Sequence, residues 1–215
     1  MAGAGLVLLI VDDHPLFRTA LKVAASRAVP EADILEAGSV NEAVESMRGL
    51  QRLDLVLLDL FMPDANGYSG IATVHAERPD MPIIVISALG AAEAAASAVR
   101  FGAANYLSKT ADLDTIARTI SSTLAGHRMA VPTDQCLGND AMAEQIASLT
   151  PAQLKVLIAV LGGRLNKQIA FDLGVSEATV KAHMTVVFRK LGVHNRTQAV
   201  VAARALGMEA VVAAA

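Results

Sequence analysis

The chain has 215 residues, enough for one large domain or two modest ones. Its 53% hydrophobic content and mean hydropathy of +0.45 exclude a disordered chain. The net charge of −3 conceals an uneven distribution, because residues 1–126 hold nine Lys and Arg against fifteen Asp and Glu, whereas residues 149–207 hold eight against two. An acidic half followed by a basic half predicts a regulatory or catalytic unit joined to a part that meets a polyanion.

Cysteine content and the lengths of the apolar runs favour a cytoplasmic protein without a membrane partner. Cys136 is the only cysteine, which excludes an internal disulfide, and we expect an inert thiol there. The apolar segment Leu6–Val11 has no basic region before it and ends at Asp12 and Asp13, so it does not predict a signal peptide. No uncharged stretch of about 18 residues is apolar enough to span a bilayer.

The first 125 residues alternate between short apolar runs and helical periodicity. Strands are predicted at Leu6–Val11, Asp33–Ala37, Leu55–Leu58, Ile83–Ile86 and Ala104–Leu107. Helices are predicted between and after them, at Pro15–Ala28, Asn41–Gly49, Gly67–Arg78, Ala91–Phe101 and Asp112–Ala125. Ser39 and Glu42 form a capping-box pattern at the second helix. Continuous apolar runs are typical of strands buried on both faces, so five strand–helix repeats predict an α/β fold with a doubly wound parallel sheet.

Beyond residue 148 the periodicity is only helical. Residues 126–148 are rich in turn formers and predict a linker with a short helix at its end. Thr150 and Gln153 form a capping box for a helix that ends at Gly162. Three further helices are predicted at Asn166–Leu173, Glu177–Leu191 and from Asn195 to near Gly207. The tight turn at 174–176 predicts a helix-turn-helix, so we expect an α/β domain at 1–125, a linker at 126–148 and an all-α domain of four helices at 149–215.

Polar side chains follow the predicted strands at their carboxyl ends, where open parallel sheets bind ligands. Asp12 and Asp13 end the first strand, Asp59 the third and Ser87 the fourth, and Lys109 follows the fifth. Three clustered carboxylates repel one another unless a cation neutralises them, and an all-oxygen site suits Mg²⁺. Lys109 would pair with a phosphoryl oxygen and Ser87 would donate a hydrogen bond to one. Asp59 would be the nucleophile that forms an acyl phosphate.

Other interpretations of these carboxylates are weaker. A single Asp after a strand is more often a helix cap or a turn residue, and the joint placement at several strands favours the site. An ATPase interpretation of Leu55–Asp59 fails because no Gly-x-x-x-x-Gly-Lys-[Ser/Thr] loop follows the first strand. A small-molecule phosphohydrolase shares the Asp and Mg²⁺ chemistry but does not explain the basic half.

Four segments resemble the receiver domain of two-component response regulators: Val11–Pro15, Leu57–Gly67, Val85–Ala88 and Gly102–Lys109. The resemblance covers residues 6–125 and implies a flavodoxin-like fold. It also implies that a sensor histidine kinase phosphorylates Asp59 and that the chain catalyses no more than its own phosphotransfer and dephosphorylation. By the same resemblance, Asp12, Asp13, Asp59 and the backbone carbonyl of Phe61 would hold Mg²⁺. Ser87 and Tyr106 would form a switch pair.

Two departures from the receiver pattern carry expectations of their own. Phe61 and Leu89 are apolar beside the expected phosphate, where many receivers have polar residues that position water. We therefore expect slow self-dephosphorylation, because a drier site offers no aligned nucleophile. The nearly uncharged segment Ala91–Ala98 either packs closely against a partner or is a surface helix of high propensity.

The third helix of the basic half predicts a groove-reading face. Its apolar residues recur at helical spacing and should face the core: Val180, Met184, Val187 and Leu191. The opposite face carries short and basic residues: Ala178, Lys181, Ala182, Thr185 and Arg189. Lys reaches guanine or phosphate, and Ala or Thr touches a thymine methyl, so this face fits the major groove. A merely solvated basic face is the alternative, and it is less persuasive in a module of this charge.

This half also resembles the LuxR-type DNA-binding domain. The resemblance lies in Leu149–Pro151, Asn166–Ala170, Leu173–Ser176, Thr179–His183 and Arg189–Ala199. The residues expected to contact double-stranded promoter DNA are Lys181, Ala182, Thr185, Arg189, Thr179 and, at phosphates, Lys167, Lys190 and Arg196.

Together the two resemblances imply the NarL/FixJ class of transcriptional regulators. The expected function is DNA binding switched by phosphorylation of Asp59, with a homodimer forming in the phosphorylated state. The alternative is a receiver that acts mainly as a protein-interaction module, with DNA binding independent of phosphate.

Overall fold

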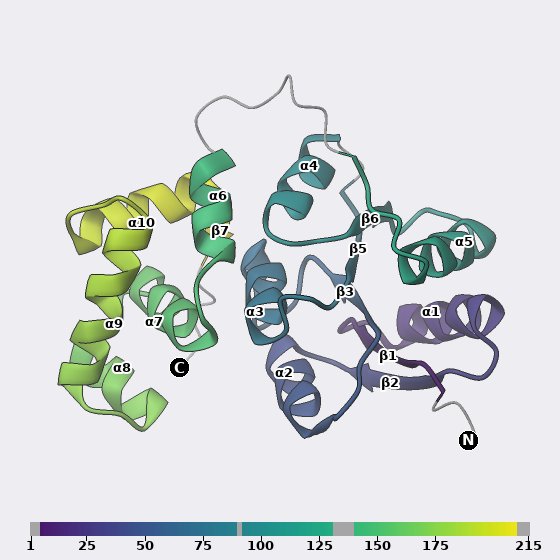
Figure 1. The fold of residues 1–215 in the computed structure, drawn as a ribbon, viewed down its shortest axis with the longest axis horizontal. Coiled ribbons are helices and arrows are strands. Elements are labelled where there is room, and N and C mark those ends of the chain that lie inside the picture. The colour runs from purple at the N-terminus through teal and green to yellow at the C-terminus, as the bar shows by residue number, and fades with distance from the viewer. Residues whose placement is uncertain (1–4, 90–91, 131–139, 210–215) are drawn as a thin grey trace.

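The computed structural model describes residues 5–89, 92–130 and 140–209 (Figure 1). Its N-terminal part is built on one parallel sheet with the strand order β2-β1-β3-β5-β6. These strands are β1 (Val7–Val11), β2 (Asp33–Ala37), β3 (Leu55–Asp59), β5 (Ile83–Ser87) and β6 (Asn105–Ser108). The sheet therefore confirms the predicted doubly wound order, in which the chain moves first to one side of β1 and then to the other.

Helices cover both faces of this sheet. In Figure 1, α1 (Pro15–Ala28) and α5 (Leu113–Leu124) lie on one face. The other face carries α2 (Val40–Gly49), α3 (Ser69–Glu77) and α4 (Ala92–Arg100). Every residue of β3 and β5 is buried, which explains why the sequences of these strands are almost uninterrupted apolar runs. A separate apolar cluster fills each side of the sheet, so the helices of both layers are needed to exclude water.

Local chemistry places most helix ends where the sequence predicts them, with two corrections. The side chain of Ser39 accepts a hydrogen bond from the Glu42 amide, but the Glu42 carboxylate accepts one from the Gly38 amide, so the predicted box is only half formed. The predicted helix Gly67–Arg78 begins only at Ser69. Gly67 has a φ of +58°, which a helix cannot accommodate, and it forms the short strand β4 (Asn66–Gly67) instead.

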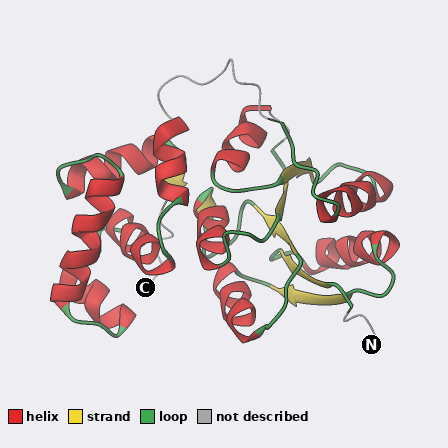
Figure 2. Cartoon of the chain, viewed as in Figure 1, coloured by secondary structure: helices red, strands yellow, loops and turns green. Residues whose placement is uncertain are grey.

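The C-terminal part is helical, as predicted, and Figure 2 shows its helices next to α3 and α4, on the side of these helices away from the sheet. Its elements are α6 (Asp140–Ala147), α7 (Pro151–Leu161), α8 (Asn166–Leu173), α9 (Glu177–Lys190), α10 (Arg196–Ala205) and the short strand β7 (Met208–Glu209). The capping box of Thr150 and Gln153 is present, and Ser176 caps α9. Gly174 adopts the left-handed conformation that ends α8 and lets α9 follow directly. Among the described residues, no helix is long and apolar enough to cross a membrane.

The two parts of the chain pack against each other. Helix α3 contacts α6 and α7, α4 contacts α6, and β4 pairs with β7. One apolar cluster runs through the seam, because Ala98 and Phe101 belong to the same buried cluster as Ala143 and Ile146. The small-residue segment that includes α4 therefore packs closely against a helix of its own chain. Cys136 lies outside the described residues.

Candidate functional site

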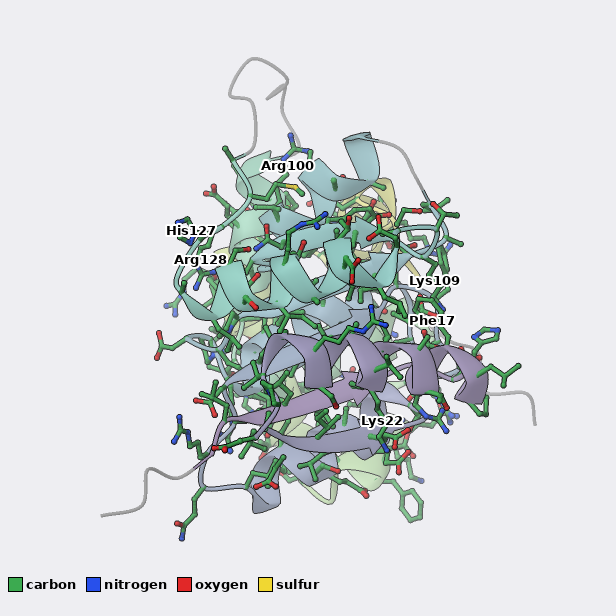
Figure 3. All side chains as sticks on the ribbon, turned by 90° about the vertical axis from the view of Figure 1, so that its right-hand side faces the viewer. Phe17, Lys22, Arg100, Lys109, His127 and Arg128 are labelled. Atoms are coloured by element: carbon green, nitrogen blue, oxygen red, sulfur yellow. The ribbon has the colours of Figure 1, made fainter. Side chains whose placement is uncertain are left out.

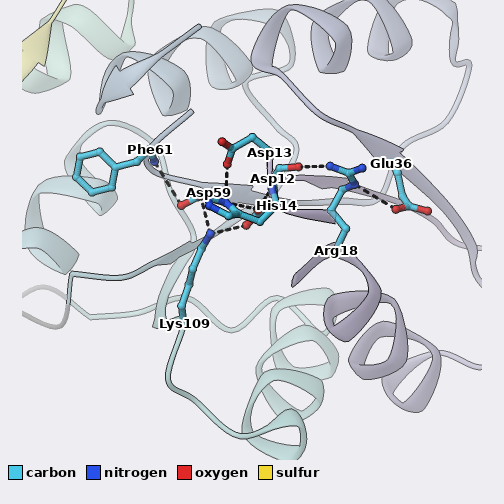
Figure 4. A network of polar contacts seen from close by, with 8 residues as sticks. All are labelled: Asp12, Asp13, His14, Arg18, Glu36, Asp59, Phe61 and Lys109. Atoms are coloured by element: carbon cyan, nitrogen blue, oxygen red, sulfur yellow. Dashed lines mark hydrogen bonds and ion pairs between the residues drawn. The ribbon is translucent and has the colours of Figure 1, made fainter. Parts of the chain in front are cut away.

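Three carboxylates and one ammonium group meet at the carboxyl edge of the sheet (Figure 4). Asp12 and Asp13 follow β1, and Asp59 ends the neighbouring strand β3. Lys109 follows β6 and reaches back across the edge to them. The strands are parallel, so their carboxyl ends meet and bring together residues that are far apart in the sequence.

Lys109 makes the central ion pairs of this site. Its ammonium nitrogen lies 2.7 Å from a carboxylate oxygen of Asp59 and 2.7 Å from one of Asp12. Burial alone would lower the pKa of the Lys109 ammonium, but the two carboxylates outweigh burial and raise this pKa. The Phe17 ring of α1 lies beneath the ammonium, which is 4.7 Å from the ring centroid (Figure 3). Lys109 is therefore a permanent positive charge held in one position.

Asp59 is almost completely buried. Burial raises the pKa of its carboxyl group, and the hydrogen bond from Lys109 opposes that rise. The backbone amide of Phe61 donates to one Asp59 oxygen at 3.3 Å, and Lys109 donates to the other. These two donors fix the orientation of the carboxylate at the end of β3.

The donor set fits a hard divalent cation such as Mg²⁺. Ligand atoms of Asp12, Asp13, His14 and Asp59 all lie within 4.8 Å of one another. One buried oxygen of Asp12 and one of Asp13 accept no hydrogen bond, although Lys109 and His14 lie within ion-pair distance of them. Buried oxygens in this condition are costly unless a cation or water satisfies them. The four side chains could therefore hold a metal ion.

An apolar cavity of about 520 Å³ opens directly onto this cluster. Its walls include Leu16, Phe17 and Phe61, and Asp59 and Lys109 lie at its polar side. Phe61, which is 45% exposed, lines this cavity, whereas Leu89 lines a different cavity, between the two parts of the chain. Apart from Asp59 and Lys109, His14 is the polar side chain among the residues that line this cavity, and the others are apolar.

Ser87 and Tyr106 are linked through one backbone segment. Ser87 is fully buried at the end of β5, and its hydroxyl oxygen accepts a hydrogen bond from the Leu89 amide at 3.2 Å. The Tyr106 hydroxyl donates to the Leu89 carbonyl at 2.5 Å. Burial raises the pKa of this hydroxyl, so it remains a donor at neutral pH. A displacement of the Ser87 side chain would therefore move the Leu89 backbone and disturb its hydrogen bond with Tyr106.

The second candidate site is the outer face of α9. Val180, Met184 and Val187 are buried in the helical core, which confirms the predicted apolar stripe. The predicted outer residues are all exposed: Ala178, Lys181, Ala182, Thr185 and Arg189. The Thr185 hydroxyl donates to the Lys181 carbonyl at 3.0 Å. Thr179 belongs to the start of the helix, where its amide donates to the side chain of Ser176.

Three further cations predicted near DNA differ in their surroundings. Lys167 is exposed on α8. The Lys190 ammonium donates to the Ser148 carbonyl at 2.7 Å. The Arg196 guanidinium donates to the Val160 and Arg164 carbonyls and so satisfies the C-terminal end of α7. Lys190 and Arg196 therefore tie the helices together, and Lys167 projects into solvent.

Comparison with known proteins identifies both parts of the chain. Residues 8–121 match the model of the response regulator receiver domain, and residues 147–203 match that of the bacterial regulatory proteins of the luxR family. The chain belongs to the NarL/FixJ class of response regulators. The glycerol metabolism activator of Pseudomonas putida is 33% identical to this response regulator over 207 residues, which cover 91% of this chain and 94% of that protein.

Two other proteins support the same assignment. The nitrate/nitrite response regulator NarL of Escherichia coli K12 is 29% identical over 201 residues, covering 90% of this chain and 93% of NarL. The structure of the RcsB response regulator of Salmonella typhimurium has a TM-score of 0.53 with 18% identity, and the match covers 94% of this chain and 98% of that one. At this identity the likeness concerns the fold. The response regulator is thus a transcription regulator that carries a receiver domain and a LuxR-type domain.

Several residues that support the site in this response regulator were missed from the sequence. His14 lies 2.7 Å from Asp13 and is a fourth possible metal donor. The Arg18 guanidinium donates to the Asp12 carbonyl at 2.6 Å. Phe17 contacts Lys109, which is distant in sequence. These contacts arise because α1 packs beside the segments that follow β1 and β6. No local sequence motif predicts them.

Proposed function

We propose that a sensor histidine kinase phosphorylates Asp59 in a Mg²⁺-dependent reaction, and that this phosphorylation controls the binding of promoter DNA by α9. The observation that carries the proposal is the Lys109 ammonium that bridges Asp59 and Asp12, beside Asp13 and at the mouth of an open cavity. The receiver and LuxR-type matches support the same assignment. The response regulator would act in the cytoplasm, where promoter DNA is found.

Phosphotransfer here is a nucleophilic displacement. One Asp59 oxygen attacks the phosphorus of a phosphohistidine, the new P–O bond forms as the P–N bond breaks, and the imidazole leaves with the electron pair of the broken bond. Lys109 neutralises charge on the transferred phosphoryl oxygens, and its contacts with Asp12 and Phe17 hold it in place. Mg²⁺ would be held by Asp12, Asp13, Asp59 and the Phe61 carbonyl and would supply further charge neutralisation.

The phosphorylated state would be detected by Ser87 and Tyr106. The Ser87 hydroxyl lies at the end of the strand next to β3 and could donate to a phosphoryl oxygen on Asp59. The same oxygen accepts from the Leu89 amide, so a shift of the Ser87 side chain toward the phosphoryl group would also displace Leu89, whose carbonyl is the partner of Tyr106. This chain of contacts carries a change at Asp59 toward the helices that pack on the sheet.

DNA recognition is assigned to the C-terminal part. We propose a receiver at 1–125, a linker at 126–148 and a DNA-binding domain at 149–215. Lys181 and Arg189 would contact bases or phosphates in the major groove, with Ala182 and Thr185 against the base edges and Lys167 at a phosphate. A homodimer of the phosphorylated protein would span two half-sites, because each chain presents one recognition helix.

Small-molecule phosphorylation tests the proposal. Wild type, Asp59→Asn and Asp80→Asn are incubated with phosphoramidate and Mg²⁺, and intact mass reports the added phosphoryl group. Asp80 is exposed on the α3–β5 turn and serves as the matched control. We expect full labelling of wild type and the Asp80 variant, none of the Asp59 variant, and loss of labelling with a chelator. Persistent labelling of Asp59→Asn would place the phosphoacceptor elsewhere.

A second candidate is DNA binding that does not depend on phosphate, with the receiver as a protein-interaction module. One observation favours it, since the outer face of α9 is exposed even while the C-terminal helices pack on the receiver. Operator affinity with and without the phosphoryl analogue beryllofluoride separates the two candidates. Equal affinity and equal cooperativity in both states would support the second.

A further inference from the structure

His14 directly follows the acidic pair and precedes α1, yet its imidazole does not cap that helix. The residue stands at the N-cap position of α1, with Pro15 as the first helical residue, and its side chain makes no capping hydrogen bond. Its backbone amide instead donates to an Asp12 oxygen at 2.7 Å, which fixes the residue beside the carboxylates (Figure 4). The ring is therefore available for another role.

The ring nitrogen Nδ1 of His14 lies within reach of two carboxylates. It is 2.7 Å from an Asp13 oxygen and 3.3 Å from an Asp12 oxygen. The Asp13 oxygen is buried and accepts no hydrogen bond, even from this nitrogen. Two donors that each bind one Zn²⁺ ion at about 2.1 Å lie roughly 3 Å from each other, so the observed distances are close to those of a shared coordination sphere.

The donor set at this edge of the sheet consists of three carboxylates and one imidazole. Ligand atoms of Asp12, Asp13, His14 and Asp59 lie within 4.8 Å of one another. Asp12 and Asp59 are almost completely buried, whereas the His14 side chain is 67% exposed and can turn toward an ion without disturbing the core. Oxygen donors suit Mg²⁺, but an imidazole donor favours borderline transition cations such as Zn²⁺. The set is therefore suited to ions of both classes.

The two oxygens of Asp59 differ in their surroundings. One lies 2.7 Å from the Lys109 ammonium, and the other accepts a hydrogen bond from the Phe61 amide at 3.3 Å. The second oxygen is the one that can ligate an ion, because the ammonium already occupies the first. A four-coordinate site closed by protein donors leaves no open position for a phosphoryl oxygen, whereas Mg²⁺ keeps water positions that a phosphate can take. An ion held by all four side chains would therefore leave neither Asp59 oxygen free to attack phosphorus.

We propose that His14 completes a four-donor site for a borderline divalent transition cation such as Zn²⁺, and that this cation blocks phosphorylation because it takes Asp59 as a ligand. The effect on phosphorylation rests on the proposed function, whereas the binding of the cation does not. His14 thereby makes the phosphoacceptor sensitive to the kind of metal in the site. With Mg²⁺ the Asp59 carboxylate can attack, and with Zn²⁺ it is withheld.

Titration calorimetry of the full chain tests the binding of Zn²⁺. Every protein compared carries Cys136→Ser, because a free thiol is itself a zinc ligand. The ratio of Zn²⁺ affinity to Mg²⁺ affinity should fall by about 100-fold in His14→Gln, since the loss of a direct ligand costs at least as much as the loss of an outer-shell partner. His194→Gln, at an exposed position of the C-terminal part, should keep the ratio of the parent protein. An unchanged ratio in His14→Gln would overturn the proposal.

Nitrogen NMR identifies the ligand directly. Protein labelled with ¹⁵N-histidine is titrated with Zn²⁺ to an equimolar amount, and long-range ¹H–¹⁵N spectra follow the imidazoles of the five histidines. We expect a ring-nitrogen resonance to shift on ligation and the same resonance to be absent from the spectrum of His14→Gln. A His14 with a merely structural role would keep its nitrogen resonances unshifted. Shifts confined to other histidines, or none at all, would overturn the proposal.

Labelling by phosphoramidate tests the block. Each variant is compared with its own labelling in Mg²⁺ alone, so that a changed basal rate in His14→Gln does not enter the comparison. Zn²⁺ should suppress labelling of the parent protein and of His194→Gln at concentrations about 100-fold lower than those that suppress labelling of His14→Gln. Removal of Zn²⁺ with a chelator, followed by fresh Mg²⁺, should restore labelling.

The outcomes distinguish this proposal from the proposed function. A parent protein that is not labelled in Mg²⁺ alone would contradict the proposed function, whatever Zn²⁺ does. Labelling that continues unchanged while Zn²⁺ is bound would show that the cation leaves Asp59 free and would overturn the block. Equal sensitivity of His14→Gln and the parent protein to Zn²⁺ would show that the carboxylates hold the cation without the imidazole, which would overturn the role of His14.

Discussion

The Lys109 ammonium nitrogen lies 2.7 Å from an oxygen of Asp59, although 50 residues separate the two along the chain. The same nitrogen lies 2.7 Å from Asp12. One cation thus neutralises two buried carboxylates that would otherwise repel each other. In the proposed phosphotransfer, this cation is already in place to receive a phosphoryl oxygen.

Replacing Lys109 should impair phosphorylation strongly. Lys109→Ala removes the charge that faces the transferred group, and the rate of labelling by phosphoramidate should fall by roughly 100-fold, as for the loss of one preorganised donor. Lys22→Ala is the matched control, because Lys22 pairs with Glu36 on the exposed surface of α1. An unchanged rate in Lys109→Ala would show that the Asp59–Lys109 pair is only structural.

Magnesium should stabilise the folded protein through the acidic cluster. A ligand that binds only the native state adds about 2.7 kcal/mol at 100 times its dissociation constant, so the melting temperature of wild type should rise with Mg²⁺. Asp13→Asn should lose most of this rise, whereas Asp33→Asn, at an exposed position of β2, should keep it. Equal increases in wild type and Asp13→Asn would exclude Asp13 as a ligand.

His75 should make stability depend on pH. Burial, aided by the charge of Arg128, lowers the pKa of His75 below its usual range, and Asp80 opposes this change. The unfolded chain then binds a proton at a higher pH than the folded protein does, so stability is greatest above about pH 6.5 and falls as the pH is lowered. Chemical denaturation from pH 7.5 to 5.5 measures the loss. His75→Gln should reduce the loss, and His194→Gln, at an exposed position, should not.

Phe61 should prolong the phosphorylated state. Its half-exposed ring flanks the approach to Asp59, and we expect Phe61→Asn to shorten the lifetime of the acyl phosphate roughly tenfold by giving water a polar partner. Leu16→Asn changes another apolar wall of the same cavity and serves as the control. A wild-type half-life of minutes that Phe61→Asn leaves unaltered would contradict the hypothesis of a dry site.

The recognition face can be tested with two lysines. Lys181→Ala should weaken operator binding by about 1–3 kcal/mol and reduce its salt dependence, because this exposed side chain would contact a base or phosphate. Lys22→Ala is the control, since Lys22 lies on α1 of the receiver part and pairs with Glu36. Unchanged affinity and salt dependence of Lys181→Ala would show that the assignment of α9 to the groove is wrong.

The sequence alone predicts the sheet, most helix ends and the acidic cluster, for identifiable reasons. Buried parallel strands carry uninterrupted apolar runs such as Leu55–Leu58, and helix starts carry caps such as Ser176 and Asn195. The carboxyl ends of parallel strands lie at the same edge of a sheet, so the sequence predicts that Asp12 and Asp59 lie close together. The apolar stripe of α9 follows from its helical spacing in the same way.

Other features depend on contacts between segments that are distant in the sequence. Strands β4 and β7 have two residues each, too few for any periodicity, and Gly67 falls where the pattern predicts helix. The partners of Lys190 and Arg196 are backbone carbonyls of other helices, which no local pattern reveals. The small residues of α4 suit close packing, but α6 as their partner emerges only from the fold.

Features that the sequence predicts differ from features that only the tertiary structure decides in the range of the forces that produce them. Hydrophobic periodicity, caps and charged motifs act within a few residues, so the sequence by itself determined two domains, an acidic edge of the sheet and a basic helix-turn-helix. The docking of one domain on the other depends on shape complementarity between Gly67, Gly207 and the stacked rings of Tyr68 and Phe101. Only the tertiary structure decided that the recognition helix stays exposed while its domain is held.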